Sequence, residues 1–176
     1  GFEIISVREP GGTETGEKIR KILLPKEEWE FPLAHRAEAL LFAAGRAQLV
    51  AEVIDPALHR GAAVISDRTF FSSIAYQGAA RGLGMTQVLK INEFALQETI
   101  PGCVILLNID PELGLGREGE SDRISKSDLR FHRNVNRAYR EIAKIFDKRF
   151  VVVDASMPFD DVVNKCVSII SERWGI

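Results

Sequence analysis

The sequence predicts a three-layer α/β domain in which helices flank a parallel sheet. Segments with strand character alternate with segments of helical spacing in regular order along the chain. The strand segments at 62–66 and 103–109 are apolar on both faces, which is typical of parallel strands covered by helices on both sides. A chain of 176 residues can bury one sizeable core, so we expect residues 1–176 to form a single domain.

The first half of the chain carries the signals of two strands and four helical segments. Pro10, Gly11 and Gly12 end the first strand, and Ile19 and Ile22 follow at helical spacing. These signals predict, in order, a strand at 2–7, a helix at 14–24, a polar loop at 26–32, a long helix at 33–59 with Pro56 near its end, a strand at 62–66, a helical stretch at 72–79, a Gly-rich loop at 81–84 and a helix at 86–98.

The second half of the chain repeats the alternation. The segment CVILLNI at 103–109 is the clearest strand signal, and Pro111 suits the first turn of a helix. The remaining signals predict a helix from Pro111 that breaks down in the polar segment 117–127, a helix at 128–147, a strand at 150–153 and a helix at 160–174.

Charge and cysteine content limit the class of protein. A formal net charge of −2 gives no support for a protein that coats nucleic acid. Cys103 and Cys166 lack the spacing of metal ligands, and two buried free thiols fit a reducing cytoplasm. No stretch resembles a signal peptide or is apolar and long enough to span a membrane. We therefore expect a cytoplasmic protein with neither a nucleic acid nor a membrane as its partner.

Charged side chains follow three of the predicted strands. Arg8 ends the first strand, Asp67 and Arg68 end the second, and Asp154 ends the last. In open parallel sheets, ligands bind beyond the carboxyl ends of the strands. A single charge there is most simply a solvated loop residue, but two arginines at two strand ends favour a phosphate site, because the guanidinium fork matches phosphate geometry.

Two helical segments carry groups that suit a nucleobase. Phe42 and Arg46 lie four residues apart, so they share one face of the long helix. Ser73, Tyr76 and Gln77 fall on one side of a later helical turn. A ring beside a guanidinium can stack on a base while the arginine donates to a base carbonyl. From the spacing alone, Phe42 is more simply interpreted as a core residue, like Leu40 and Leu41.

Four stretches together resemble bacterial thymidylate kinase, a member of the P-loop nucleoside monophosphate kinase family. They are R-E-P-G-G-T at 8–13, L-L-F-A-A-G-R at 40–46, D-R-x-x-x-S-S-x-A-Y-Q-G at 67–78 and G-E-S-D-R-I at 119–124. They occur in the family's order, and the resemblance covers essentially the whole chain. It implies a P-loop NTPase-type fold and ATP-dependent phosphorylation of dTMP to dTDP.

The resemblance also implies which residues bind dTMP. Arg8 and Arg68 would hold its phosphate. Phe42 would stack on thymine, and Arg46 would donate to the exposed carbonyl of the base. Ser73 and Gln77 would contact the base, and Tyr76 would pack against the deoxyribose.

Further roles concern catalysis, ATP and the assembly. Asp67 would lie near Mg²⁺, Arg68 would act in catalysis, and Asp154 and Ala155 would lie along the adenine of ATP. A lid at about 117–127 would supply a catalytic arginine that stabilises the transferring phosphoryl group; the candidates are Arg117 and Arg123, or both together. The resemblance also implies a homodimer built from the long helices, and it favours a cis peptide bond between Glu9 and Pro10.

The stretch PGGTETGEK at 10–18 imitates a phosphate-binding loop. Gly11 and Gly16 have the separation of Walker A glycines, but Glu17 and Lys18 follow where Lys and Ser or Thr are required. We interpret this stretch as the turn and helix start after the first strand of the chain.

A true Walker A motif occurs nowhere in the sequence. The resemblance implies that a strand, a P-loop and a helix precede residue 1, with that strand between those at 62–66 and 103–109. Two alternatives remain open at this stage. One is another nucleoside monophosphate or deoxynucleoside kinase on the same fold, and the other is a non-catalytic nucleotide-binding relative without a P-loop.

Overall fold

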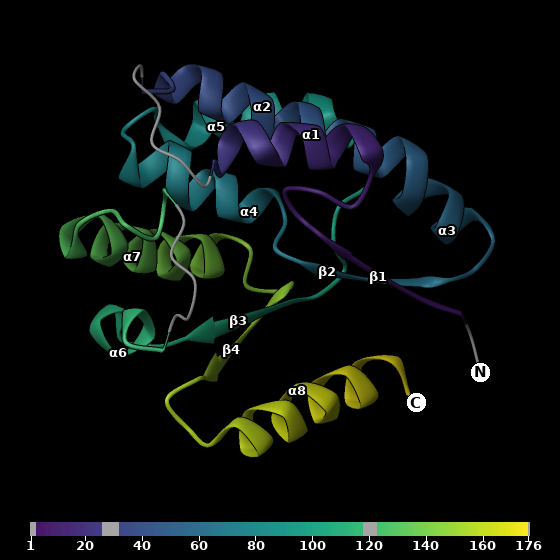
Figure 1. The fold of residues 1–176 in the computed structure, drawn as a ribbon. Helices are drawn as coiled ribbons and strands as arrows, with labels where there is room; N and C mark the ends of the chain where they lie inside the picture. The colour runs from purple at the N-terminus through teal and green to yellow at the C-terminus, as the bar shows by residue number, and fades with distance from the viewer. Residues whose placement is uncertain (1–2, 26–31, 118–122, 176) are drawn as a thin grey trace. The chain divides into compact units, whose positions relative to one another are not determined.

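The computed structural model describes residues 3–25, 32–117 and 123–175. They form two compact units. The first comprises Gly1–Ile100 and Ser121–Ser127, and the second comprises Pro101–Glu120 and Asp128–Ile176. Figure 1 shows the helices and strands of both units. The predicted loop at 26–32 and part of the predicted lid lie outside the described residues.

Two parallel strands form the sheet of the first unit. Strand β1 (Ile4–Arg8) pairs with β2 (Ala63–Asp67) in a register that places Arg8 opposite Asp67. The amide of Glu9 then donates to the carbonyl oxygen of Asp67 at 3.0 Å, which extends the pairing by one step. The two strands therefore end together, and the charged residues that follow them lie at the same edge.

Helix α1 (Glu14–Leu23) begins at the turn that imitates a P-loop. The Oγ1 atom of Thr13 accepts a hydrogen bond from the amide of Gly16 at 2.9 Å, which caps the helix. Gly11 and Gly12 have φ angles of 134° and 81°, a region that favours glycine. The structure confirms the predicted turn and helix start, and it confirms the cis bond between Glu9 and Pro10.

The predicted long helix at 33–59 is continuous but changes its winding. Helix α2 (His35–Leu49) leads into the π-helical segment η1 (Val50–Ile54) and then into α3 (Asp55–His59). The amide of Asp55 donates to Val50, five residues earlier. Pro56 follows at once and has no amide hydrogen, so the regular i to i−4 ladder cannot continue through this position.

Three more helical segments complete the first unit. Helix α4 (Phe70–Ser73) and the π-helical η2 (Ile74–Ala80) replace the single stretch predicted at 72–79, and α5 (Met85–Leu96) follows the Gly-rich loop. Figure 1 shows α1, α2 and α5 side by side, and contacts join α2 to both neighbours. The apolar core of this unit includes the fully or almost fully buried Leu23, Leu49, Phe71, Ala75 and Val88.

The second unit contains a second parallel pair. Strand β3 (Val104–Asn108) pairs with β4 (Phe150–Asp154), so Asn108 lies opposite Asp154 at the carboxyl ends. Helix α6 (Pro111–Leu115) follows β3, and α7 (Leu129–Ile145) precedes β4. Helix α8 (Phe159–Trp174) ends the unit, and Figure 1 shows α7 and α8 on opposite sides of the strand pair.

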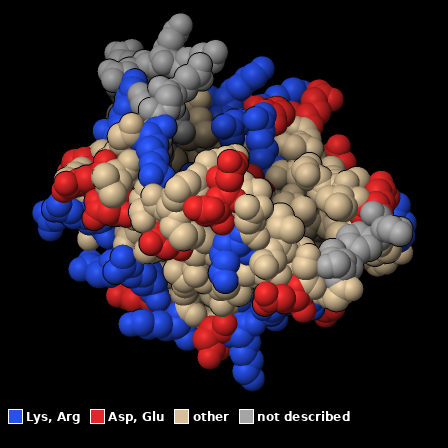
Figure 2. All heavy atoms as spheres, turned by 90° about the horizontal axis from the view of Figure 1, so that it is seen from below, with Lys and Arg blue, Asp and Glu red and all other residues tan. Residues whose placement is uncertain are grey.

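Parallel strands covered by helices confirm the predicted α/β class. Within the part of the chain that the structure describes, β2 pairs with β1 and β3 pairs with β4, so each sheet has two strands. No helix in the described ranges has both the length and the apolar character that crossing a bilayer requires. Figure 2 shows Lys and Arg side chains interspersed with Asp and Glu on the face that it displays.

Candidate nucleotide site

Arg8 lies at the carboxyl end of β1 with about half of its side chain exposed. Its Nη2 atom donates to both carboxylate oxygens of Glu17, at 3.1 Å each. The Glu17 carboxylate also accepts from the amide of Gly12 at 3.1 Å. The Gly12 amide, followed by the Arg8 guanidinium, holds the pKa of Glu17 below its ordinary value. Glu17 is therefore an ionised anchor that orients Arg8 at the open strand end.

Arg68 occupies the turn after β2 in a left-handed backbone conformation, with φ at 68°. Ser66 supports this turn, because its hydroxyl donates to the carbonyl oxygen of Arg68 at 2.7 Å. The guanidinium carbon lies 5.6 Å from the ring centre of Tyr76, a cation–π distance. A non-glycine residue in this conformation is uncommon and is found preferentially at functional sites. The structure thus brings together two predicted site residues, Arg68 and Tyr76.

Arg46 lies in the interior of the first unit, with a residue exposure of 2%. It forms an ion pair with Glu9 and donates hydrogen bonds to Asn92 and, at 3.3 Å, to the hydroxyl of Ser73. Burial raises the pKa of Glu9 above its ordinary value, and the Arg46 charge offsets this only in part. Among the described residues, Nε of Arg46 has no hydrogen-bond partner. Two predicted base-binding residues, Arg46 and Ser73, are therefore in direct contact.

Glu38 is the centre of a second buried polar cluster, and its side chain is fully buried. Its Oε1 atom accepts from Nε2 of Gln77 at 2.8 Å and from Nε of Arg81 at 3.5 Å. Its Oε2 atom accepts from Nη2 of Arg123 at 2.6 Å. Burial alone would raise the pKa of Glu38, but the bonds from Gln77 and Arg123 and the arginine charges hold it below its ordinary value.

Phe42 lies one helical turn before Arg46 on α2 and is half-buried. Its ring is neither sealed in the core nor fully exposed, so burial does not decide between the core and stacking roles.

In the second unit, Arg117 lies against the turn after β4. Its Nη1 atom donates to the carbonyl of Ala155 at 2.7 Å, and its Nη2 atom donates to that of Ser156 at 3.3 Å. The Asp154 carboxylate accepts from the amide of Ser156 at 2.9 Å, and Ser156 lowers the pKa of Asp154. The structure therefore joins one predicted lid arginine to the turn predicted for adenine.

Arg123, the other predicted lid arginine, belongs to the first unit. Besides its bond to Glu38, its Nε atom donates to the carbonyl of Leu23, the last residue of α1, at 3.2 Å. The predicted lid residues 118–122, which include most of the G-E-S-D-R-I motif, lie outside the described residues.

Asp67 is the one carboxylate that the sequence analysis assigned to a metal. It is exposed at the end of β2. The described ranges contain no group of three His, Cys, Asp or Glu side chains placed to hold a metal ion. A lone exposed carboxylate nevertheless fits Mg²⁺, which often uses one or two carboxylates together with water and substrate phosphates.

Sequence reasoning assigned no role to three residues that hold the predicted site in place. Glu17 was noted only as wrong for a P-loop, and Glu38 and Asn92 were not noted. A weak signal existed for Asn92, which is a buried polar residue within the otherwise apolar pattern of α5. Glu38 likewise precedes the apolar run of α2 and is fully buried.

Parallel strands with helical cover, and arginines at two adjacent strand ends, are the features of an α/β nucleotide kinase. Comparison with known proteins makes this specific. The family model described as thymidylate kinase matches residues 1–166. The chain belongs to the thymidylate kinase family, which confirms both the resemblance and the predicted P-loop NTPase-type fold.

Individual relatives give the same result over nearly the whole chain. A thymidylate kinase of Geobacillus thermodenitrificans is 45% identical over 98% of this chain and 78% of its own length. One from Geobacillus sp. strain WCH70 is 40% identical over 98% of this chain and 84% of its own length. One from Lactobacillus delbrueckii subsp. bulgaricus is 43% identical over 98% of this chain and 82% of its own length.

Proposed function

We propose that the ends of β1 and β2, with the facing side chains of α2 and η2, bind dTMP for phosphoryl transfer from ATP. Membership of the thymidylate kinase family makes the chain a dTMP kinase, as the sequence predicted. The observation that carries the binding proposal is the pairing of β1 with β2 in register, which sets Arg8 opposite Asp67 and beside Arg68. Both arginines are exposed at the one edge where ligands of parallel sheets bind.

In this proposal, Arg8 and Arg68 hold the phosphate of dTMP. Glu17 keeps the guanidinium of Arg8 at the strand end, and the ring of Tyr76 supports that of Arg68. A guanidinium group binds phosphate through charge-assisted hydrogen bonds, which contribute about 1.5–3 kcal/mol each.

The base and sugar contacts come from α2, α4 and η2. Phe42 stacks on thymine, Arg46 donates to a base carbonyl, and Tyr76 packs against the deoxyribose. The unsatisfied Nε atom of Arg46 supports its role, since a buried donor without an acceptor is costly and a ligand carbonyl can satisfy it. Ser73 and Gln77 contact the base from the neighbouring turn.

Further proposed roles concern catalysis and ATP binding. We propose that Arg117 or Arg123 stabilises the transferring phosphoryl group, and that Asp154 and Ala155 lie along the adenine of ATP. Asp67 would lie near Mg²⁺ at the phosphates, because Mg²⁺ often uses one or two carboxylates together with water and substrate phosphates. When bound, Mg²⁺ supplies charge neutralisation at the phosphate oxygens.

The side chains of this chain do the positioning: Arg68 orients the acceptor phosphate, and a lid arginine neutralises charge as the phosphoryl group moves.

We also propose that both units belong to one kinase domain, with a lid at about 117–127. No Walker A motif occurs in residues 1–176, so a preceding strand, P-loop and helix would cradle the ATP phosphates. The intact mass of the stably folded, active protein tests this. A mass above 19.6 kDa supports the proposal, and an active protein of 19.6 kDa contradicts it.

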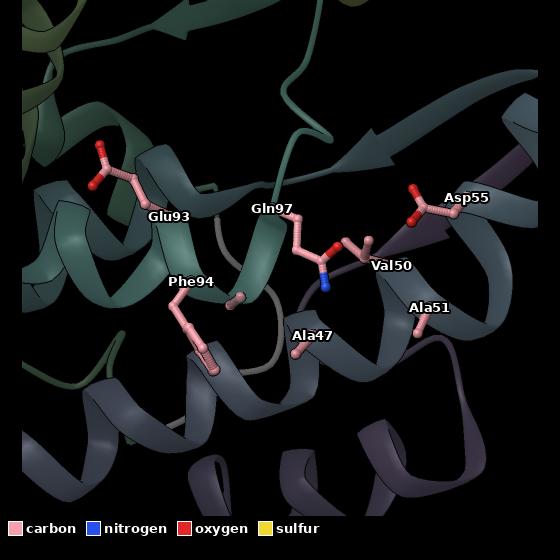
Figure 3. Close-up of a pocket in the computed structure, with 8 residues that line it drawn as sticks. Ala47, Val50, Ala51, Asp55, Glu93, Phe94 and Gln97 are labelled. Carbon is pink, nitrogen blue, oxygen red and sulfur yellow. The ribbon is translucent and has the colours of Figure 1, made fainter.

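The assembly that we propose is a homodimer in the cytoplasm, formed through α2 and α5. Leu40 is 56% exposed and Phe94 is 89% exposed, and both are apolar. Figure 3 shows Ala47, Val50 and Ala51 along one helical segment, with Phe94 projecting toward it from α5. These residues line a hollow of about 530 Å³. A second copy of the chain would cover this apolar surface.

Turnover of dTMP, dUMP, dCMP and thymidine tests the substrate. We expect the highest kcat/KM with dTMP, and preferential use of thymidine would overturn the proposal. Arg68→Ala tests the phosphate site and should lower kcat/KM for dTMP by about 100-fold, because one bidentate contact is lost. Arg60→Ala is the matched control, since Arg60 is exposed and pairs with Glu3 at the opposite end of the same strands.

A further inference from the structure

Glu38 holds the side-chain amide of Gln77 from inside the first unit. The carboxylate is fully buried in the first turn of α2, and Gln77 lies on η2, 39 residues later in the chain. The distance from Nε2 of Gln77 to Oε1 of Glu38 is 2.8 Å, which is a normal hydrogen bond. Gln77 itself is 2% exposed, so its amide lies inside the first unit, where Glu38 is its hydrogen-bond partner.

The chemistry of this contact fixes which way the amide points. An ionised carboxylate only accepts hydrogen bonds, so the NH₂ group of Gln77 must face Glu38. The carbonyl oxygen, Oε1, then faces away from Glu38. Within the described residues, no hydrogen bond occupies this oxygen. Glu38 therefore presents Gln77 to a ligand as a hydrogen-bond acceptor.

The charge of Glu38 is secured by its other contacts. Arg123 donates to Oε2 at 2.6 Å, and Arg81 lies 3.5 Å from Oε1. Two guanidinium groups keep the buried carboxylate ionised, and an ionised carboxylate cannot donate to Gln77 in place of accepting. The orientation of the amide is thus determined by charge rather than by packing alone.

An acceptor at this position selects among pyrimidines. Thymine and uracil carry a hydrogen on N3 and can donate to Oε1 of Gln77, whereas N3 of cytosine is itself an acceptor. We propose that Glu38 is a positioning residue that holds the carbonyl of Gln77 toward the base and so favours pyrimidines with a protonated N3. This inference rests on the proposed function, in which Gln77 contacts the base of the mononucleotide.

The test substitutes Glu38 in the full-length protein and compares two ligands. Glu38→Gln keeps the shape of the side chain but can donate as well as accept, so the amide of Gln77 is free to turn over. We expect the ratio of the dCMP dissociation constant to the dTMP dissociation constant, measured by calorimetry, to fall about tenfold. A change of this size corresponds to the loss of one neutral hydrogen bond. A purely structural role would weaken both ligands equally and leave the ratio unchanged, which would overturn the proposal.

Glu52→Gln is the matched control for this substitution. Glu52 is exposed on η1 and also accepts a hydrogen bond from a glutamine, Gln48, at 2.8 Å. The same change of carboxylate to amide there should leave the ligand ratio at its wild-type value. A fall in the ratio for Glu52→Gln would contradict the proposed route through Gln77.

Two further variants keep the test decisive. If Glu38→Gln does not fold, Glu38→Asp takes its place. This variant retains the charge but moves the carboxylate away from Gln77 by one methylene, so it should also lower the ratio of the two dissociation constants. In a Gln77→Leu background, substitution of Glu38 should have no further effect on the ratio, because its effect passes through the missing amide. An unchanged ratio in Glu38→Asp, or a further fall in the double variant, would overturn the inference.

Turnover of the wild-type protein separates this inference from the proposed function. Phosphorylation of dTMP with an unchanged ligand ratio in the Glu38 variants defeats the inference alone. Failure of the wild-type, full-length protein to bind or phosphorylate dTMP defeats the proposed function, and the inference falls with it.

Discussion

Glu9 and Arg46 form a buried ion pair that joins the turn after β1 to the middle of α2. The two side chains are 7% and 1% exposed, and Glu9 directly follows Arg8, the last residue of β1. Asn92 and Ser73 accept further hydrogen bonds from Arg46. One guanidinium thus connects β1, α2, α4 and α5, so the position of the predicted base-binding residues depends on a single buried charge.

Removal of that guanidinium should destabilise the fold. Arg46→Met leaves the Glu9 carboxylate buried without its partner, and breaking a buried pair in this way costs about 3–5 kcal/mol. The free energy of unfolding from urea titration measures the effect. The double variant Glu9→Gln with Arg46→Met should recover part of the loss, because no unpaired charge remains. A loss below about 1 kcal/mol in the single variant would show that the pair contributes little.

Glu38 should make the folded protein sensitive to acid. Its pKa in the folded state lies below the ordinary value of 4.5, so its contribution is present above that pH. The contribution is lost as the pH falls below 4.5 through the lowered pKa, because the unfolded chain takes up the proton first. We expect the unfolding free energy of the wild type to fall more steeply than that of Glu38→Gln in this acidic range.

Glu3→Gln provides the comparison for this pH effect. Arg60 also lowers the pKa of Glu3, but this pair is about half exposed and should be screened by salt. The acid dependence attributable to Glu3 should therefore weaken at high ionic strength, whereas that of Glu38 should persist. Equal slopes for the wild type and Glu38→Gln would contradict the assignment.

Gly16 is required by close packing in the turn that imitates a P-loop. A Cβ atom at Gly16 would lie 2.7 Å from the carbonyl oxygen of Gly11 and 2.9 Å from Oγ1 of Thr13. Gly16→Ala should therefore cost about 1–3 kcal/mol of unfolding free energy, because the clash displaces the cap of α1. Thermal or urea unfolding measures this cost.

Gly45→Ala is the matched control for Gly16→Ala. Gly45 lies within α2, and a Cβ atom there would meet Ile19 at an ordinary 3.7 Å. Alanine should stabilise this helical position by about 0.5–1 kcal/mol, because glycine loses more backbone entropy on folding. If the two substitutions had the same effect, the clash in the turn would not be the cause.

The order of the elements was predictable because its signals are local. Hydrophobic spacing within each segment located α1 and β3, and the observed ends differ from the predicted ones by one residue at most. The π-helical winding of η1 was not predicted. Pro56 indicated a disturbance near the end of the long helix, but spacing alone does not distinguish a π segment from a helix end.

The polar contacts around the candidate site were not predictable by the same means. Glu38 and Arg123 are 85 residues apart in the chain, and Arg46 and Asn92 are 46 apart. Spacing rules compare residues within a few turns of one helix, so they cannot detect such pairs. The resemblance to a family indicated residues that face a ligand, such as Arg8, but it said nothing of the carboxylates behind them.

The two lid arginines should differ in their effect on catalysis. Arg123 is bound to the buried Glu38 and to the carbonyl of Leu23, whereas Arg117 is exposed and contacts two backbone carbonyls. Arg117 is therefore the more readily released to a phosphoryl group. We expect Arg117→Met to lower kcat by about 100-fold, and Arg123→Met to lower it less.

The charge of the Arg117 side chain and its planar shape can be tested separately. Arg117→Lys retains the charge without the planar fork, so it should recover part of the lost kcat. A larger fall in kcat for Arg123→Met than for Arg117→Met would reverse the assignment.

Phe94 should be the residue on which the proposed homodimer depends most. It is 89% exposed on α5, beside the apolar hollow that Ala47 and Ala51 line. Large apolar side chains at the centre of an interface contribute most of its binding energy, and a buried carboxylate without a partner opposes association. Phe94→Glu should therefore shift the protein from dimer to monomer in sedimentation experiments at micromolar concentration. Phe159→Glu, at an 80% exposed position on α8, should leave the dimer intact, and dissociation by both variants or by neither would exclude this surface as the interface.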